Sequence, residues 1–248
     1  MKTAAGLAGS AGASLGVVML QTGDNSITRG SLLSFQTTSL YGMYAAYRDV
    51  RLFNGLSQYK YKMPMDSFAE LSTAPFRWRV MKKPEVWGGI LGSFALAAGA
   101  AYCYHQFAHV PEAQTPCSIS KTIDFSPALA LPIGISEESF FRGFLQSTFC
   151  ETFSPTTGIV LSSLAFGAAH IPNALLLNEG ARWAYYSFSL PMITLLGGYA
   201  GWVTHRNHSL QESVAIHTWY DAILFSIDLM ARQSASTGRP AFAIAVPF

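Results

Sequence analysis

The sequence predicts an all-α protein, a polytopic bundle of about six or seven transmembrane helices around a central polar cavity. Half of its 248 residues are hydrophobic, only 12% are charged, and the mean hydropathy is +0.25. Soluble domains carry about 25% charged residues. Here the charged residues collect in short stretches between long apolar runs. Because lipid offers no partner for backbone polar groups, helices are the simplest elements that could span a membrane.

The apolar runs set the expected spans, since about 20 residues cross the hydrocarbon core of a bilayer. Two weaker candidates lie near the N-terminus, at Ala4–Leu20 and Ser31–Tyr47, and the first of them could instead be a signal-like leader. Five stronger candidates follow: Trp87–Phe107, Phe125–Thr148, Thr156–Leu177, Trp183–Val203 and Ser209–Met230.

A basic connection divides the chain into an N-terminal region, residues 1–86, and a C-terminal domain, residues 87–248. The stretch from Arg48 to Val86 contains eight Lys and Arg residues but only four Asp and Glu residues. By the positive-inside rule we expect this loop in the cytoplasm. Two parts of it, 63–70 and 75–83, could form amphipathic helices on the membrane surface. The chain has no basic strip interleaved with aromatic residues, so no nucleic-acid partner is expected.

One predicted span contains two carboxylates and a guanidinium, Glu137, Glu138 and Arg142. Each charged residue within a membrane costs about 2.5–3.5 kcal/mol on insertion scales, so such residues usually have a function. Glu138 and Arg142 are four residues apart on one helix face and can form an ion pair. Glu137 is rotated by about 100° from Glu138, which leaves its carboxylate available as a general acid or base. A buried salt-bridge network without catalysis is the alternative.

The next spans contribute two histidines at a comparable depth. His170 precedes Pro172, which should end or kink its helix. His217 and Asp221 are four apart on one face, so Asp221 could fix the tautomer of the imidazole. At 1.5 Å per residue, Glu137, His170 and His217 each lie about 12 to 21 Å from the cytoplasmic helix ends. This shared depth favours a common site over separate packing roles.

These residues occur in three ordered motifs: Glu137-Glu138-x-x-x-Arg142, Phe166-x-x-x-His170 and His217-x-x-x-Asp221. The set resembles the CPBP family of intramembrane endopeptidases, also called the CAAX protease and bacteriocin-processing, or Abi, family. The resemblance extends from Glu137 to Asp221 and includes no motif in the first 85 residues. It implies a helical bundle around a cavity and cleavage of peptides or protein tails.

The resemblance also implies roles for the site residues. Glu137 would activate the attacking water, with His170 helping to orient or deprotonate it. Glu138 and Arg142 would hold the groups around them in place.

Two features of the site remain open at this point. The resemblance implies that His217 and Asp221 support the oxyanion or position the water. Many relatives have Asn where this chain has Asp221, and an ionised carboxylate cannot donate to an oxyanion, so control of the His217 tautomer is the safer role for Asp221. Zinc is the candidate metal, with Glu137, His170 and His217 as candidate ligands and one position left for water. A glutamate-dependent mechanism without a bound metal would use the same residues.

The expected activity is therefore intramembrane peptide hydrolysis, by a metallo- or glutamate-dependent enzyme that is a multi-pass protein of a bacterial cytoplasmic membrane. Its expected partners are membrane lipid and a peptide or protein-tail substrate. The main alternative is a non-catalytic membrane adaptor or regulator that keeps the bundle and its buried polar network. A proton-coupled carrier is a second alternative, although carriers often contain paired repeats and none is visible here.

Overall fold

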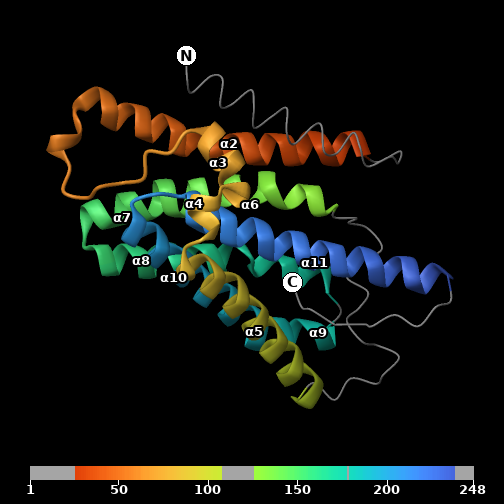
Figure 1. Cartoon of the computed structure of the whole chain (residues 1–248). Coiled ribbons are helices and arrows are strands. Elements are labelled where there is room, and N and C mark those ends of the chain that lie inside the picture. Colours follow the sequence, from red (N-terminus) through yellow and green to blue (C-terminus); the bar gives the residue numbers. More distant parts are fainter. Residues whose placement is uncertain (1–25, 108–125, 178, 238–248) are drawn as a thin grey trace.

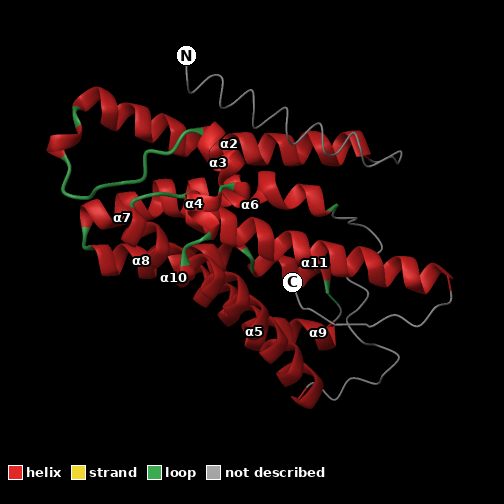
Figure 2. Cartoon of the chain, in the orientation of Figure 1, coloured by secondary structure: helices red, strands yellow, loops and turns green. Residues whose placement is uncertain are grey.

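The computed structural model describes residues 26–107, 126–177 and 179–237, and every regular element in these ranges is helical (Figure 2). The weak candidate span Ala4–Leu20 lies outside the described residues. The longer helices are α2 (Ser26–Asn54), α5 (Pro84–Phe107), α8 (Pro155–Ala169), α10 (Leu190–Asn207) and α11 (Gln211–Thr237). The predicted all-α class is confirmed for these residues.

Shorter segments connect or extend these helices. In chain order they are the 3-10 turn Leu56–Gln58, α3 (Phe68–Thr73), the 3-10 turn Ala74–Phe76, α4 (Trp78–Met81), the 3-10 turn Pro127–Leu129, α6 (Ala130–Glu138), the π-helical segment Ser139–Gln146, α7 (Ser147–Thr152), the 3-10 segment Ile171–Leu176, α9 (Glu179–Ala184) and the π-helical segment Tyr185–Ser189. The predicted span Phe125–Thr148 is thus a helix that changes type along its length.

α6 occupies the centre of the bundle. It packs against α2 on one side and α11 on the other, while α8 packs against α10 (Figure 1). α5 crosses α11 obliquely and also contacts α10. This arrangement places residues of α2, α5, α6, α8, α10 and α11 around one interior space.

Local signals explain where α8 begins and ends. The Ser154 side chain accepts a hydrogen bond from the Thr157 backbone N–H, and Pro155 occupies the first turn, where its missing N–H costs nothing. The helix ends at Ala169, and His170 is its C-terminal cap. The 3-10 segment Ile171–Leu176, which contains Pro172, follows. The predicted end of the helix near Pro172 is confirmed, and it places His170 at a helix terminus.

The predicted number of spans is not confirmed. Among the described residues, one helical stretch, Pro155–Leu175, is both long enough and apolar enough to cross a membrane, with a mean hydropathy of 1.3. Its outer face carries the exposed side chains of Val160 and Leu164. The described parts of the predicted spans Ser31–Tyr47, Trp87–Phe107, Phe125–Thr148, Trp183–Val203 and Ser209–Met230 do coincide with helical segments, and polar residues lower the mean hydropathy of α2 and α11.

The basic connection between α2 and α5 packs into the protein. Its Tyr61, Met63 and Leu71 are buried in a cluster with Tyr44 of α2 and Leu210 just before α11. Helical structure within it is limited to α3, α4 and two 3-10 turns. The stretch 63–70 is helical only from Phe68 onward, whereas 75–83 contains the end of a 3-10 turn and the short helix α4. Burial against α2 and α11 offers this segment an apolar partner other than the membrane surface.

Candidate functional site

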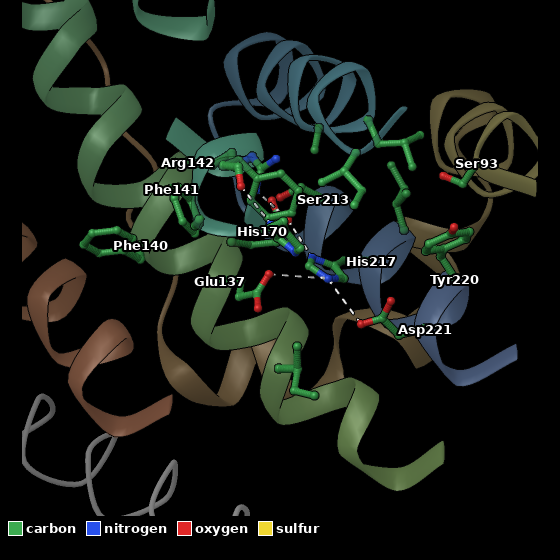
Figure 3. Close-up of a pocket in the computed structure, with 18 of the residues that line it drawn as sticks. Ser93, Glu137, Phe140, Phe141, Arg142, His170, Ser213, His217, Tyr220 and Asp221 are labelled. Carbon is green, nitrogen blue, oxygen red and sulfur yellow. Dashed lines mark hydrogen bonds and ion pairs between the residues drawn. The ribbon is translucent and has the colours of Figure 1, made fainter. Parts of the chain in front are cut away.

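A cavity of about 670 Å³ lies within the bundle and is lined by residues of α2, α5, α6, the π-helical segment that follows α6, α8, α10 and α11. Figure 3 shows Glu137, His217 and Asp221 directed toward one another, with His170 beside them. All six predicted site residues line this cavity: Glu137, Glu138, Arg142, His170, His217 and Asp221. Residues that are up to 84 positions apart in sequence therefore share one space.

Glu138 and Arg142 form the predicted ion pair in the cavity wall. Glu138 Oε1 accepts a hydrogen bond from Arg142 Nη1 at 3.0 Å, and each side chain is about 1% exposed. The Arg142 guanidinium also lies 4.2 Å from the centre of the Phe166 ring, a cation–π contact. Arg142 belongs to the π-helical segment, a helix form that is often found at functional sites.

Glu138 also receives a hydrogen bond from α11. His217 Nδ1 donates to Glu138 Oε1 at 2.8 Å, so one carboxylate oxygen joins the imidazole to the guanidinium. This contact links α6 to α11 across 79 residues and was not predicted from the sequence. The shortest contact that orients the His217 ring is therefore the one with Glu138, and the contact with Asp221 is longer.

The opposite ring nitrogen of His217 faces the other two carboxylates. His217 Nε2 lies 3.3 Å from Asp221 Oδ2 and 3.9 Å from Glu137 Oε2. Asp221 thus contacts the imidazole, as its spacing predicted, but at the nitrogen that faces Glu137. Both ring nitrogens approach carboxylates, so an imidazolium would be satisfied on both sides.

His170 is fixed in a different way. Its Nδ1 lies 2.8 Å from the Phe166 carbonyl oxygen, and because a carbonyl can only accept, Nδ1 must carry the hydrogen. The Tyr185 hydroxyl donates to the His170 carbonyl oxygen at 2.9 Å, which holds the backbone at this helix end. In neutral His170 the lone pair is therefore on Nε2, where it can accept a proton or bind a metal.

The donor set was compared with the requirements of a zinc site. Among the residues that the structure describes, no three His, Cys, Asp or Glu side chains are arranged to hold a metal ion. Both ring nitrogens of His217 face carboxylates, which suits an imidazolium, and an imidazolium has no lone pair for a metal ion. In this arrangement Glu137, His170 and His217 do not fit a metal centre, and the predicted zinc stays a prediction.

Several residues that sequence reasoning did not select also line the cavity. Leu33, Gln36 and Leu40 form one face of α2, outside every recognised motif, and Asn173 follows His170 by three residues. The spacing of three and four residues along α2 is that of a helix face and would have identified its inward side. Nothing in the sequence indicated that this face would meet α6.

Comparison with known proteins gave one family match. Residues 120–223 match the model of a family described as Rce1-like, type II CAAX prenyl endopeptidase. No curated protein and no solved structure matched the chain. The matched segment contains all three motifs, and it confirms the resemblance to the CAAX protease family over this part of the chain.

Proposed function

Residues 120–223 belong to the Rce1-like family of type II CAAX prenyl endopeptidases, and from this premise we propose that the chain is an intramembrane endopeptidase. It would hydrolyse a peptide bond of a membrane-associated peptide or protein, as a multi-pass protein of a bacterial cytoplasmic membrane. The family is membrane-embedded, and the exposed apolar face of α8 agrees with that setting.

One observation carries the proposal: Glu137 faces the cavity with its carboxylate uncommitted, beside a histidine whose tautomer is fixed. Among the described residues, the nearest ionic partner of Glu137 is His217 Nε2 at 3.9 Å, beyond hydrogen-bond distance. The His170 Nδ1–H is bonded to a carbonyl oxygen, which leaves Nε2 as a base. A carboxylate and an imidazole base that line the same cavity can both take part in activating a water molecule.

The proposed steps use this chain's own residues. Glu137, assisted by His170 Nε2, accepts a proton from water, and the water oxygen bonds to the carbonyl carbon of the substrate. His217, as an imidazolium held by Glu138 and Asp221, donates from Nε2 to the developing oxyanion. The proton then passes to the amide nitrogen, the C–N bond breaks, and a carboxylic acid and an amine leave.

This scheme assigns Asp221 a role that a carboxylate can perform. Asp221 does not donate to the oxyanion but stabilises the positive charge on His217, from which it lies 3.3 Å. Glu138 does the same at Nδ1, and Arg142 keeps Glu138 ionised in its buried position.

Cleavage by the purified protein in liposomes tests the proposal. The family description suggests a farnesylated peptide that ends in a CAAX sequence as the first probe, with the same peptide unprenylated and a mixed peptide library alongside. Glu137→Gln should reduce kcat by about 10²- to 10⁴-fold, the range for loss of a general base, and His170→Gln by about 10²-fold. Each reaction is run with and without a chelator, which tests the metal directly.

Glu70→Gln is the matched control. Glu70 completes the capping box of α3, away from the cavity, and glutamine serves in the same position, so its activity should equal that of the wild type. If the wild type cleaves none of the probes and Glu137→Gln still complements a deletion strain, the protein is an adaptor and the endopeptidase proposal is wrong.

A further inference from the structure

The segment between α2 and α5 contacts the start of α11, the helix that carries His217 and Asp221. In this segment the buried residue Asp66 makes hydrogen bonds to both α2 and the start of α11. The Asp66 carboxylate accepts hydrogen bonds from the Leu210 backbone N–H at 2.7 Å, from Gln211 Nε2 at 2.7 Å and from Ser209 Oγ at 3.1 Å. Three donors from the start of one helix thus meet on a single carboxylate.

The backbone of Asp66 is also held by hydrogen bonds. Its carbonyl oxygen accepts hydrogen bonds from Tyr44 Oη at 3.0 Å and from Arg48 Nη1 at 2.8 Å, both on α2. Tyr44 and Arg48 are themselves buried. Asp66 therefore ties α2 to α11 through its backbone and its side chain.

A second set of contacts reinforces the first turn of α11. Gln211 Oε1 accepts from Arg77 Nη1 at 3.1 Å and from Arg79 Nη2 at 2.9 Å, while Gln211 Nε2 donates to Asp66. Lys83 pairs with Glu212 at 2.6 Å. The partners that α11 contacts here lie between residues 66 and 83, outside the matched family segment.

The distance from these contacts to the site is short. Gln211 precedes His217 by six residues, about 9 Å along the helix axis. Rotation or sliding of the first turn of α11 therefore moves His217, whose Nδ1 must stay 2.8 Å from Glu138 Oε1. Catalytic groups tolerate displacements of only about 0.5 Å or 10–20° before the reaction slows.

We propose that Asp66 is a positioning residue of the site: by tying the start of α11 to α2, it sets the rotation and depth at which α11 presents His217 to Glu138 and Glu137. This proposal rests on the proposed function for its effect on turnover. Under this proposal the N-terminal region contributes to catalysis through a residue that lies outside the three motifs of the C-terminal domain.

A donor–acceptor exchange tests this role. Asp66→Asn replaces an acceptor with a donor opposite Gln211 Nε2, and Gln211→Glu makes the converse change, so each single variant sets two like groups against each other. The double variant Asp66→Asn/Gln211→Glu restores one donor facing one acceptor and the original net charge. We expect kcat to fall by about 10- to 100-fold in Asp66→Asn, the scale of a displacement of up to 1 Å, with KM within about twofold. The double variant should recover to within about threefold of the wild type.

A second readout needs no cleavage. A Cβ built at Gly134 of α6 lies 2.9 Å from Thr218 Oγ1 and 3.4 Å from the Thr218 backbone nitrogen. The variant with both Gly134→Cys and Thr218→Cys should therefore form a disulfide under an added oxidant when α11 is in its native position. The rate of this crosslink should drop at least threefold with Asp66→Asn and recover in the exchanged pair. The pH–rate profile should also shift in Asp66→Asn, since the contacts of His217 with Glu138 and Asp221 change.

The outcomes separate the two proposals. If the wild type crosslinks but cleaves no probe, the endopeptidase proposal fails while the crosslinking rates still decide the role of Asp66. The positioning role is overturned if Asp66→Asn leaves the crosslinking rate unchanged, or if the exchanged pair fails to restore a rate that Asp66→Asn has lowered.

Discussion

Replacing Arg142 with methionine should destabilise the fold by about 3–5 kcal/mol, the cost of removing one partner from a buried ion pair. Arg142 and Glu138 are each about 1% exposed, and their contact is 3.0 Å long. Glu138 Oε2 has no hydrogen-bond partner among the described residues. Without Arg142, the carboxylate would lose one of the two charged groups that contact it and keep the other, His217. The cation–π contact with Phe166 would be lost as well.

A double-mutant cycle with Glu138→Gln measures the interaction separately from the cost of each change. Unfolding by sodium dodecyl sulfate in mixed micelles gives the free energy of unfolding for the wild type, both single variants and Glu138→Gln/Arg142→Met. Because the double variant leaves no unpaired buried charge of this pair, its loss should be smaller than the sum of the single losses by about 2 kcal/mol or more.

Arg206→Met is the matched control for this cycle. Arg206 is exposed and lies 5.4 Å from the centre of the Trp202 ring, a contact that is worth about 0.5–1 kcal/mol at an exposed site. A loss below about 1 kcal/mol in Arg142→Met, or single losses that add within about 0.5 kcal/mol, would show that Arg142 does not balance Glu138. The assignment of Glu138 as an ionised partner of His217 would then be wrong.

Two further predictions concern Cys150 and Glu151, which lie near the C-terminal end of α7. Gly158→Ala should cost about 1–3 kcal/mol by overpacking, because an added Cβ would lie 2.7 Å from the Cys150 backbone nitrogen. In the same unfolding assay Gly92→Ala should stabilise the fold by up to about 1 kcal/mol, because among the described residues no atom outside its own helix turn lies within 4 Å of the added Cβ. Burial opposes ionisation of Glu151, but two loop amides and Arg51 outweigh it and lower the pKa of this carboxyl. A carboxyl whose pKa is lowered in the folded state stabilises the fold above its unfolded-state pKa, and this stabilisation is lost as the pH falls through its folded-state pKa. Glu151→Gln should therefore cost about 1–3 kcal/mol at pH 7 and progressively less in unfolding curves below about pH 4.5. An equal cost at pH 7 and below about pH 4.5 would contradict this prediction.

Contacts within one helix could be predicted from the sequence, and contacts between helices could not. The spacing of four residues predicted the Glu138–Arg142 pair, because residues i and i+4 share a helix face wherever the helix packs. Pro172 similarly predicted the helix end that leaves His170 as a cap. Both signals are local and do not depend on the rotation of neighbouring helices.

The bond between His217 and Glu138 depends on how α6 and α11 are rotated about their axes, and packing of whole helix faces sets that rotation. The convergence of Glu137, His170 and His217 at one depth was expected from helix lengths, but the nitrogen that each carboxylate faces was not. The packing of the basic connection could not be predicted for a related reason, because the burial of Tyr61, Met63 and Leu71 depends on partners in α2 and α11 that are distant in sequence.

The face of α2 that carries Leu33, Gln36 and Leu40 closes one side of the cavity, although it lies about 100 residues before Glu137 and outside the matched family segment. Under the proposed function, the groups that break the bond and part of the wall that a substrate touches are therefore encoded in separate stretches of the chain. Substrate preference can then drift through changes in α2 while the reaction chemistry is preserved. Exchanging this helix between relatives is accordingly a route to altered selectivity that leaves every proposed catalytic side chain in place.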